Sequence, residues 1–185
     1  MKFLVFVKAT PNSEKGIFPP DSEKLFADMG AFNEQLVKAG IMQEADGLKP
    51  SSAGKRIKFS DKAPALVIDG PFAETKELVA GYWIWNVKSL DEAVEWAKRC
   101  PNPMPGEEGI LEIRPCYTLE DLAHLVPKEE YEREVRLRDQ AAGQQKAKSK
   151  AKGTAKRAAK RLAKPKAAPA RKKSAKQKRG RAKAK

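Results

Sequence analysis

The stretch Gly81 to Lys88 reads GYWIWNVK, and it is aromatic and β-branched with no breaker inside it. Such a run is typical of a β-strand. Ser89 follows in the position of a helix N-cap, and Glu92 stands three residues later, where it can complete a capping box. The next apolar residues recur at helical spacing, at Leu90, Ala93, Val94 and Ala97. We therefore predict a strand that runs directly into a helix.

The N-terminal part repeats this order of strand and helix. Lys2 to Lys8 (KFLVFVK) is apolar on both of its alternating faces, which predicts a central strand covered on both sides. A helical face follows at spacings of four, three and four, at Leu25, Met29, Phe32 and Leu36. Gly40 is expected to end that helix. Further strands are expected at 41–48 and 110–113, and the arms of a hairpin at 56–59 and 65–68.

The predicted order is β-α-β, a hairpin, then β-α-β. This order favours an α+β fold, a ferredoxin-like sandwich with its helices on one sheet face. The other face also carries apolar and aromatic side chains, within 3–7 and 82–87. A second copy packed sheet to sheet is the simplest cover for such a face, so we expect a homodimer.

Charge divides the chain sharply. The whole chain has 38 Lys+Arg and 24 Asp+Glu, a net charge of +14. Residues 141–185 hold 19 of the basic residues and no acidic one, which leaves 19 basic and 24 acidic residues in 1–140. Because Leu162 is the only large apolar residue of 141–185, that segment is expected to be disordered in isolation. We divide the chain into a domain at 1–117, a charged helical extension at 118–140 and a basic tail at 141–185.

Composition also excludes several classes of protein. No apolar run approaches the roughly 20 residues of a membrane span, and 3–7 is too short for a signal-peptide core, so a cytoplasmic protein is expected. Cys100 and Cys116 form neither a disulfide framework nor a metal-ligand cluster. His124 is the only histidine, which argues against multi-histidine metal sites and a Ser-His-Asp triad. We expect no metal and no cofactor.

The segment from Asp69 to Glu77 reads DGPFAETKE and directly follows a predicted strand. A turn at Gly-Pro would place carboxylates at the rim of the sheet. Crowded carboxylates and a lysine can acquire separated pKa values and act as general acid and base. The alternative is a solvated turn with internal ion pairs. The candidate catalytic residues are Asp69, Glu74, Lys76 and Glu77.

Three further residues are candidates for binding a small ligand. Lys8 ends the first strand and could reach an anion, although a solvated lysine is the alternative. Asn33 follows Phe32 on the first helix, where it points either toward the sheet or toward solvent. Arg114, on the last strand, could contact a ligand or pair with Glu74 or Glu77.

The motif DGPFAETKE resembles the DGPF branch of the YCII-related (YciI-like) family. The likeness extends over about 115 residues, through Gly81-Tyr82-Trp83-Ile84, Ser89, Asp91-Glu92-Ala93, Trp96-Ala97, Met1-Lys2-Phe3, Met29, Phe32-Asn33, Leu36, Ala39-Gly40, Gly47-Leu48, Pro50-Ser51-Ser52 and Glu112-Ile113-Arg114. The resemblance implies a dimeric α/β barrel of ferredoxin-like subunits, with a cleft near polar residues of each subunit. The biochemical function of that family is not established. An enzymatic role around a His and Asp pair has been proposed for its YciI-like members, but the matching region here contains no histidine.

The tail repeats Lys-Ala pairs and resembles, in composition, the C-terminal tails of linker histones and some bacterial nucleoid proteins. Uncompensated positive charge binds polyanions by releasing counterions, with steep salt dependence and no sequence preference. Candidate contacts to nucleic acid are Lys146, Lys148, Lys150, Arg171, Lys172, Lys173, Arg179 and Arg181. RNA or ribosome association, an anionic membrane surface and a merely solubilising tail are the alternatives, and the lack of an apolar stripe argues against membrane.

Together these features favour a homodimeric binding protein. Its domain is expected to hold a small polar ligand near the DGPFAETKE loop, and its tail to bind nucleic acid non-specifically at the nucleoid. The alternative function is an enzyme that acts on a small metabolite by carboxylate acid/base chemistry, with Asp69 or Glu77 as the base and Lys76 as the electrostatic partner.

Overall fold

The computed structural model of the chain describes residues 1–73 and 77–144. The chain forms two compact units, Met1–Thr118 and a second that begins at Leu119. The first unit has its elements in the order β1 (Lys2–Lys8), α1 (Pro11–Glu14), α2 (Ser22–Lys38), β2 (Met42–Gly47), the 3-10 turn η1 (Ser51–Ala53), β3 (Lys55–Ser60), β4 (Ala63–Asp69), β5 (Val79–Asn86), α3 (Leu90–Ala97) and β6 (Leu111–Pro115). The predicted α+β class is confirmed, whereas α1 and η1 were not predicted.

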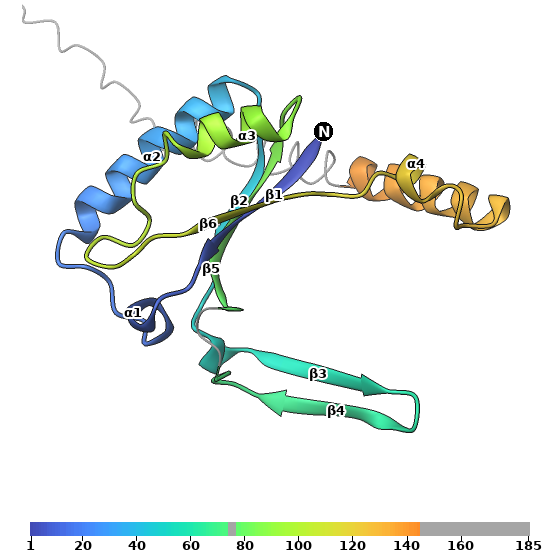
Figure 1. The fold of residues 1–185 in the computed structure, drawn as a ribbon, viewed down its shortest axis with the longest axis horizontal. Coiled ribbons are helices and arrows are strands. Elements are labelled where there is room, and N and C mark those ends of the chain that lie inside the picture. The colour runs from blue at the N-terminus through green and yellow to red at the C-terminus, as the bar shows by residue number, and fades with distance from the viewer. Residues whose placement is uncertain (74–76, 145–185) are drawn as a thin grey trace, which may run out of the picture. The chain divides into compact units, whose positions relative to one another are not determined.

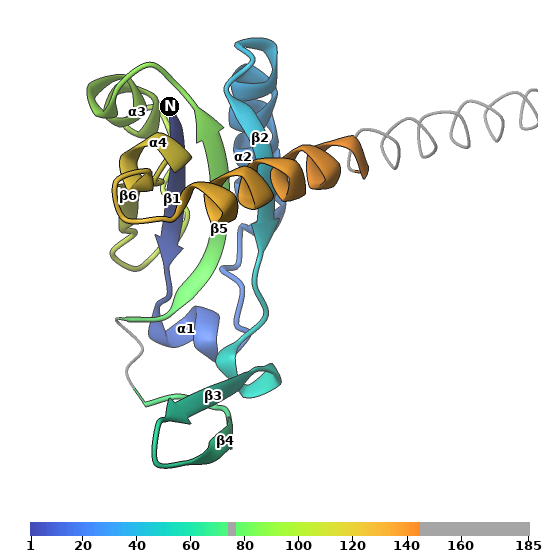
Figure 2. The same ribbon diagram turned by 90° about the vertical axis from the view of Figure 1, so that its right-hand side faces the viewer.

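Four strands form one antiparallel sheet in the order β2-β5-β1-β6. Without the β3–β4 hairpin, the order of elements is β-α-β-β-α-β, which is the ferredoxin-like arrangement. Both long helices, α2 and α3, lie on one face of this sheet (Figures 1 and 2). The hairpin forms a separate two-stranded sheet, inserted between β2 and β5.

The core lies between the sheet and the helices. Phe3 of β1 pairs with Trp85 of β5, and Val5 pairs with Trp83, so all four side chains point to the helical side. Phe32 of α2 packs its ring edgewise on both tryptophans, with ring centroids 6.3 Å and 6.4 Å away. These side chains are buried. Because burying such side chains removes apolar area from water, this cluster stabilises the fold.

The opposite sheet face has no helix from the described part of the first unit over it (Figure 1). Alternation along the strands puts Leu4, Phe6, Tyr82 and Ile84 at its centre, where they are partly exposed. We call this the open face. Its apolar centre agrees with the prediction that both faces of the central strands are apolar.

Two local details differ from their predicted form. The Ser89 hydroxyl accepts from the Glu92 backbone N–H at 3.2 Å, as an N-cap should. The Glu92 carboxylate, however, accepts from the N–H of Lys88 at 2.7 Å, one residue earlier than in a capping box. Pro115 lies inside β6 rather than after it. A proline is tolerated there because β6 is an edge strand.

The second unit is helical where it is described. It contains α4 (Leu119–Leu122), followed by helical residues from 128 to 144 on the far side of Pro127. Ion pairs one turn apart join Glu134 to Arg138 at 3.0 Å and Glu130 to Arg133 at 3.2 Å. Such exposed pairs support a solvated helix by a few tenths of a kcal/mol each. Among the residues that the structure describes, no helix is both long enough and apolar enough to cross a membrane.

Burial raises the pKa of the Cys100 thiol to about 11, because desolvation disfavours the thiolate. The thiol therefore stays protonated near neutral pH, consistent with a structural role in the half-buried layer against the core.

We expect Phe32→Ala to destabilise the first unit by about 3–5 kcal/mol, because it leaves a cavity between both tryptophans. Urea unfolding followed by tryptophan fluorescence measures this free energy. Phe26→Ala on the same helix is the matched control, since Phe26 is 61% exposed and its loss should change the free energy by less than about 1 kcal/mol. Equal effects of the two substitutions would contradict the assigned core.

Candidate functional site

Ser51 is the centre of the hydrogen bonds that hold the base of the hairpin. Its backbone N–H and its hydroxyl both donate to the Glu14 carboxylate, to Oε2 at 3.0 Å and 2.5 Å. The same hydroxyl oxygen accepts from the Phe72 N–H at 3.2 Å. Glu14 comes from α1 and Phe72 from the DGPF motif, so one serine joins three segments that are distant in the sequence.

Gly70 fits this junction because it has no side chain. A Cβ at this position would lie 1.9 Å from the Ser51 carbonyl oxygen, far inside van der Waals contact. The Gly70 N–H donates to the Gly54 carbonyl at 3.1 Å, which closes the hairpin base. The following peptide bond, to Pro71, is cis. Arg56 then covers the Phe72 ring, with its guanidinium carbon 4.1 Å from the ring centroid.

The four candidate catalytic residues do not form an enclosed group in the described chain. Asp69 ends β4 and pairs with the Lys55 ammonium, and both side chains are mostly exposed. Glu77 is also exposed. Glu74 and Lys76 lie outside the described residues. Asp69 and Glu77 are thus both accessible to solvent in the single chain.

The candidate ligand-binding residues lie in three different places. Lys8 ends β1 and pairs with Glu112 of β6 at 3.3 Å, with only 18% of its side chain exposed. Asn33 faces the core, where its Oδ1 accepts the Trp83 indole N–H at 2.8 Å. Arg114 is exposed on β6 opposite Leu4.

The expected pairing of Arg114 with Glu77 is not favoured by the strand register. Arg114 lies opposite Leu4 in β1, whereas Glu77 precedes Val79, which pairs with Lys8 at the other end of β1. The two side chains therefore belong to opposite ends of the central strand. Glu74, the other expected partner, lies outside the described residues.

Acidic side chains border the open face along β2. The Tyr82 hydroxyl donates to the Glu44 carboxylate at 3.0 Å, and this hydrogen bond raises the pKa of Tyr82. Asp46 lies opposite Tyr82 in the neighbouring strand. The open face thus has an apolar centre with two carboxylates on its β2 side.

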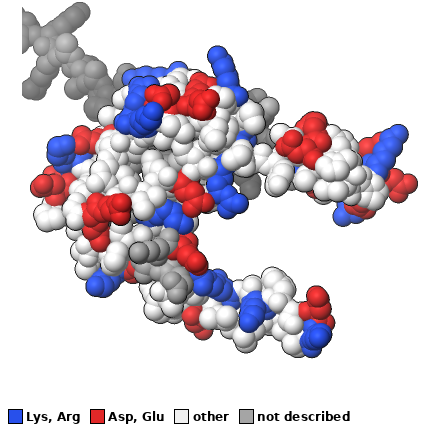
Figure 3. Space-filling view, viewed as in Figure 1, with Lys and Arg blue, Asp and Glu red and all other residues white. Residues whose placement is uncertain are grey.

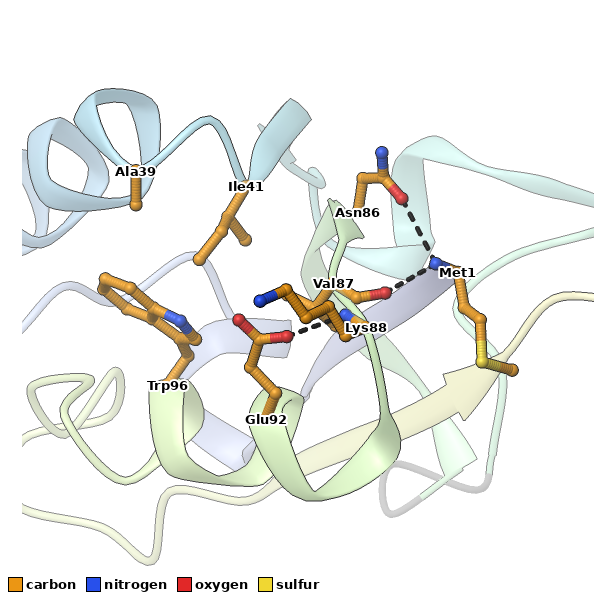
Figure 4. A pocket seen from close by; sticks show the side chains of 8 residues that line it. All are labelled: Met1, Ala39, Ile41, Asn86, Val87, Lys88, Glu92 and Trp96. Atoms are coloured by element: carbon orange, nitrogen blue, oxygen red, sulfur yellow. Dashed lines mark hydrogen bonds between the residues drawn. The ribbon is translucent and has the colours of Figure 1, made fainter.

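An open pocket of about 330 Å³ lies at the other end of the sheet from the DGPF loop. Figure 4 shows its lining, which comes from the first residue, the end of α2, the end of β5 and α3. The terminal amine of Met1 donates to the Val87 carbonyl at 2.5 Å, and Glu92 already accepts from Lys88. The Met1 amine and the Glu92 carboxylate thus each bond to another residue that lines the pocket. The DGPF loop, for which a ligand cleft was predicted, leads into the start of β5, whereas the pocket lies at the end of β5.

Charged groups of both signs are intermingled over the described residues on the face in Figure 3. Within 1–73 and 77–144, no cluster of three or more His, Cys, Asp or Glu side chains could hold a metal ion. The eight residues predicted to contact nucleic acid lie outside the described residues.

Glu14 and Ser51 were not among the predicted site residues. Ser51 belongs to the Pro50-Ser51-Ser52 stretch, which carried the family resemblance without a role. That stretch was the only available signal, because the bonded residues are 37 and 21 positions apart in the sequence and leave no local pattern.

Residues 1–118 match the family model of the YCII-related domain. The chain belongs to the YCII-related family. This YCII-related chain is also 35% identical, over 95 residues, to an uncharacterized protein of Rhizobium meliloti, an alignment that covers 51% of this chain and 75% of that protein.

Among solved structures, the YCII-related chain is similar to the 5-chloro-2-hydroxyhydroquinone dehydrochlorinase of Burkholderia phenoliruptrix, in its complex with 2,5-dihydroxybenzoquinone. The identity is 19% and the TM-score is 0.34, with 65% of this chain and 99% of that chain covered.

We expect Gly70→Ala to destabilise the chain by about 1–3 kcal/mol, since the new methyl group meets the Ser51 backbone, which can move only by disturbing the bonds to Glu14 and Phe72. Thermal unfolding by circular dichroism tests this. Gly47→Ala is the control, because nothing lies within 4 Å of its added Cβ. Unchanged stability of the Gly70 variant would overturn the packing described for this loop.

Proposed function

We propose that this YCII-related protein is a homodimer that binds nucleic acid non-specifically through residues 141–185. The observation that carries the proposal is the charge of this segment, which has 19 Lys+Arg and no Asp or Glu, next to 19 basic and 24 acidic residues in 1–140. A polymer of phosphates is the partner that such a segment attracts most strongly. Binding of this kind would associate the protein with the nucleoid.

Dimerisation would strengthen the binding of nucleic acid by the tail. Two tails on one particle bind the same polymer with an effective concentration set by their separation, which raises avidity without new contacts. The open face supports dimerisation, because the partly exposed Leu4, Phe6, Tyr82 and Ile84 gain from removal from water. Two such faces packed together would form the dimeric α/β barrel that the DGPF-type motif implies.

A small-ligand site near the DGPF loop is the second candidate function, and Lys8 favours it. Its side chain is mostly buried, and its ammonium is paired with Glu112 at one end of the open face. Lys8 lies opposite Val79, the first residue of β5, and the DGPFAETKE loop ends two residues before it. A second copy over the open face would further desolvate the Lys8–Glu112 pair. Acid/base catalysis would need more, because Asp69 or Glu77 would have to be enclosed by the second copy. We therefore rank ligand binding above catalysis.

The nucleic-acid proposal is tested by titrating a fluorescent DNA duplex at several salt concentrations. We expect deletion of 141–185 to abolish the binding. The slope of log affinity against log salt is negative. A full-length variant with glutamine at the eight named tail positions should reduce the magnitude of this slope by up to about seven, since each lost phosphate contact removes about 0.9.

The matched control keeps all eight charges by exchanging lysine and arginine at the same positions, and it should bind as the natural chain does. Undiminished binding by the deleted form would contradict a role for the tail, as would a glutamine variant with the salt slope of the natural chain.

A further inference from the structure

We propose that strand β3 of one copy adds to the free edge of strand β2 in a second copy, so that each hairpin extends the sheet of its partner. This inference rests on the homodimer proposed above, and it names the strands that join the two copies. It follows from the exposure of the hairpin, from the pattern of side chains on the two strands and from the direction in which the hairpin projects.

Every residue of β3 and β4 is exposed. The exposed side chains include large apolar ones, with exposed fractions of 80% for Phe59, 58% for Leu66, 56% for Ile57 and 55% for Val67. A two-stranded hairpin alone is at best marginally stable in water, and an apolar hairpin with two unpaired edges invites pairing with another chain. We therefore expect the β3–β4 hairpin, which we call the arm, to pair with a strand of another chain.

Strand β2 offers a matching edge. It is the outermost strand on its side of the described four-stranded sheet, so one row of its backbone groups has no neighbouring strand there. From Glu44 to Asp46 its side chains alternate between two faces, and the register with β5 shifts between Met42 and Glu44. Glu44 and Asp46 lie on the open face, whereas Met42 and Ala45 point to the core.

The side chains of β3 alternate in the same way but with the opposite charge. Arg56 and Lys58 lie on one face of the hairpin, beside Ile68 and Leu66 of β4. Ile57 and Phe59 alternate to the other face.

Placed beside β2 of a partner, β3 would bring its basic residues next to two carboxylates and its apolar residues next to the partner's Met42 and Ala45. Both faces are then matched at once, because opposite charges and apolar pairs on adjacent strands each stabilise a sheet.

The arm is held in a fixed direction. The bonds of Ser51 to Glu14 and Phe72 and of Gly70 to Gly54 fasten its base to the domain. From there it extends on the side of the sheet opposite to α2 and α3, which is the side of the open face (Figure 1). A partner seated on the open face would therefore lie within reach of the arm.

Two-fold symmetry makes this contact twice, once for each arm. A stable interface buries about 800 Å² per partner. The two arms would add their exposed apolar side chains to the area that the open faces bury.

The test uses two full-length variants with reversed charges. The arm variant carries Arg56→Glu and Lys58→Glu, and the edge variant carries Glu44→Lys and Asp46→Lys. In a homodimer of either variant, like charges would face each other at both contacts between β3 of one copy and β2 of the other. We therefore expect dimer affinity to fall at least about tenfold in sedimentation equilibrium at a fixed salt concentration. When the two variants are mixed, a heterodimer has opposite charges at both β3–β2 contacts. One contact has the two exchanged pairs, and the other has the natural residues on both sides, so we expect the heterodimer to form.

Lys38→Glu, a charge reversal on α2 outside the proposed contact, should leave dimerisation unchanged. Circular dichroism melting verifies that each variant is folded, and DNA titration follows the tail separately. A natural chain that is monomeric would overturn both the dimer and this inference. A folded arm variant that dimerises as tightly as the natural chain would overturn the inference alone, as would a mixture of the two variants that stays monomeric.

Discussion

The packing of α2 on the two tryptophans of β5 is the contact on which the first unit depends. Phe32 meets both indole rings edgewise, and the neighbouring Asn33 accepts the Trp83 N–H, so the helix is held by apolar area and by a specific hydrogen bond. Side chains alternate along β5. Because Trp83 and Trp85 point to the helical face of the sheet, Tyr82 and Ile84 must point to the opposite face. The open face is thus a direct consequence of how the core is built.

A second, polar contact organises the part of the chain that the core does not reach. The Ser51 hydroxyl accepts a hydrogen bond from the Phe72 N–H, and Ser51 donates two hydrogen bonds to Glu14. These bonds join α1, the turn before β3 and the loop after β4. Gly70 is adapted to this crowding, since any side chain would meet the Ser51 backbone. The DGPF motif therefore has a structural reason for its glycine that is independent of any chemistry at Asp69.

The helices and strands were predictable because each leaves a local repeat of two or about 3.6 residues, as in KFLVFVK or in the spacing that leads to Phe32 and Leu36. The Glu14–Ser51 bond was not predictable, because it joins side chains 37 residues apart that carry no shared pattern. The proposed acid/base group was inferred from proximity in sequence. Every residue of β4 is exposed, and the Asp69 carboxylate pairs with Lys55 at the surface.

The way in which the hairpin is anchored also has a consequence for assembly. A strand that adds to the edge of another copy closes into a pair only when the arm leaves the domain at the angle that two-fold symmetry requires. At other angles the contact repeats from copy to copy, and it forms an open filament unless the rotation closes a ring. That angle is set by the short bonds around Ser51 rather than by the large apolar core. In the proposed assembly, one serine hydroxyl therefore helps to decide between a closed particle and a growing fibre.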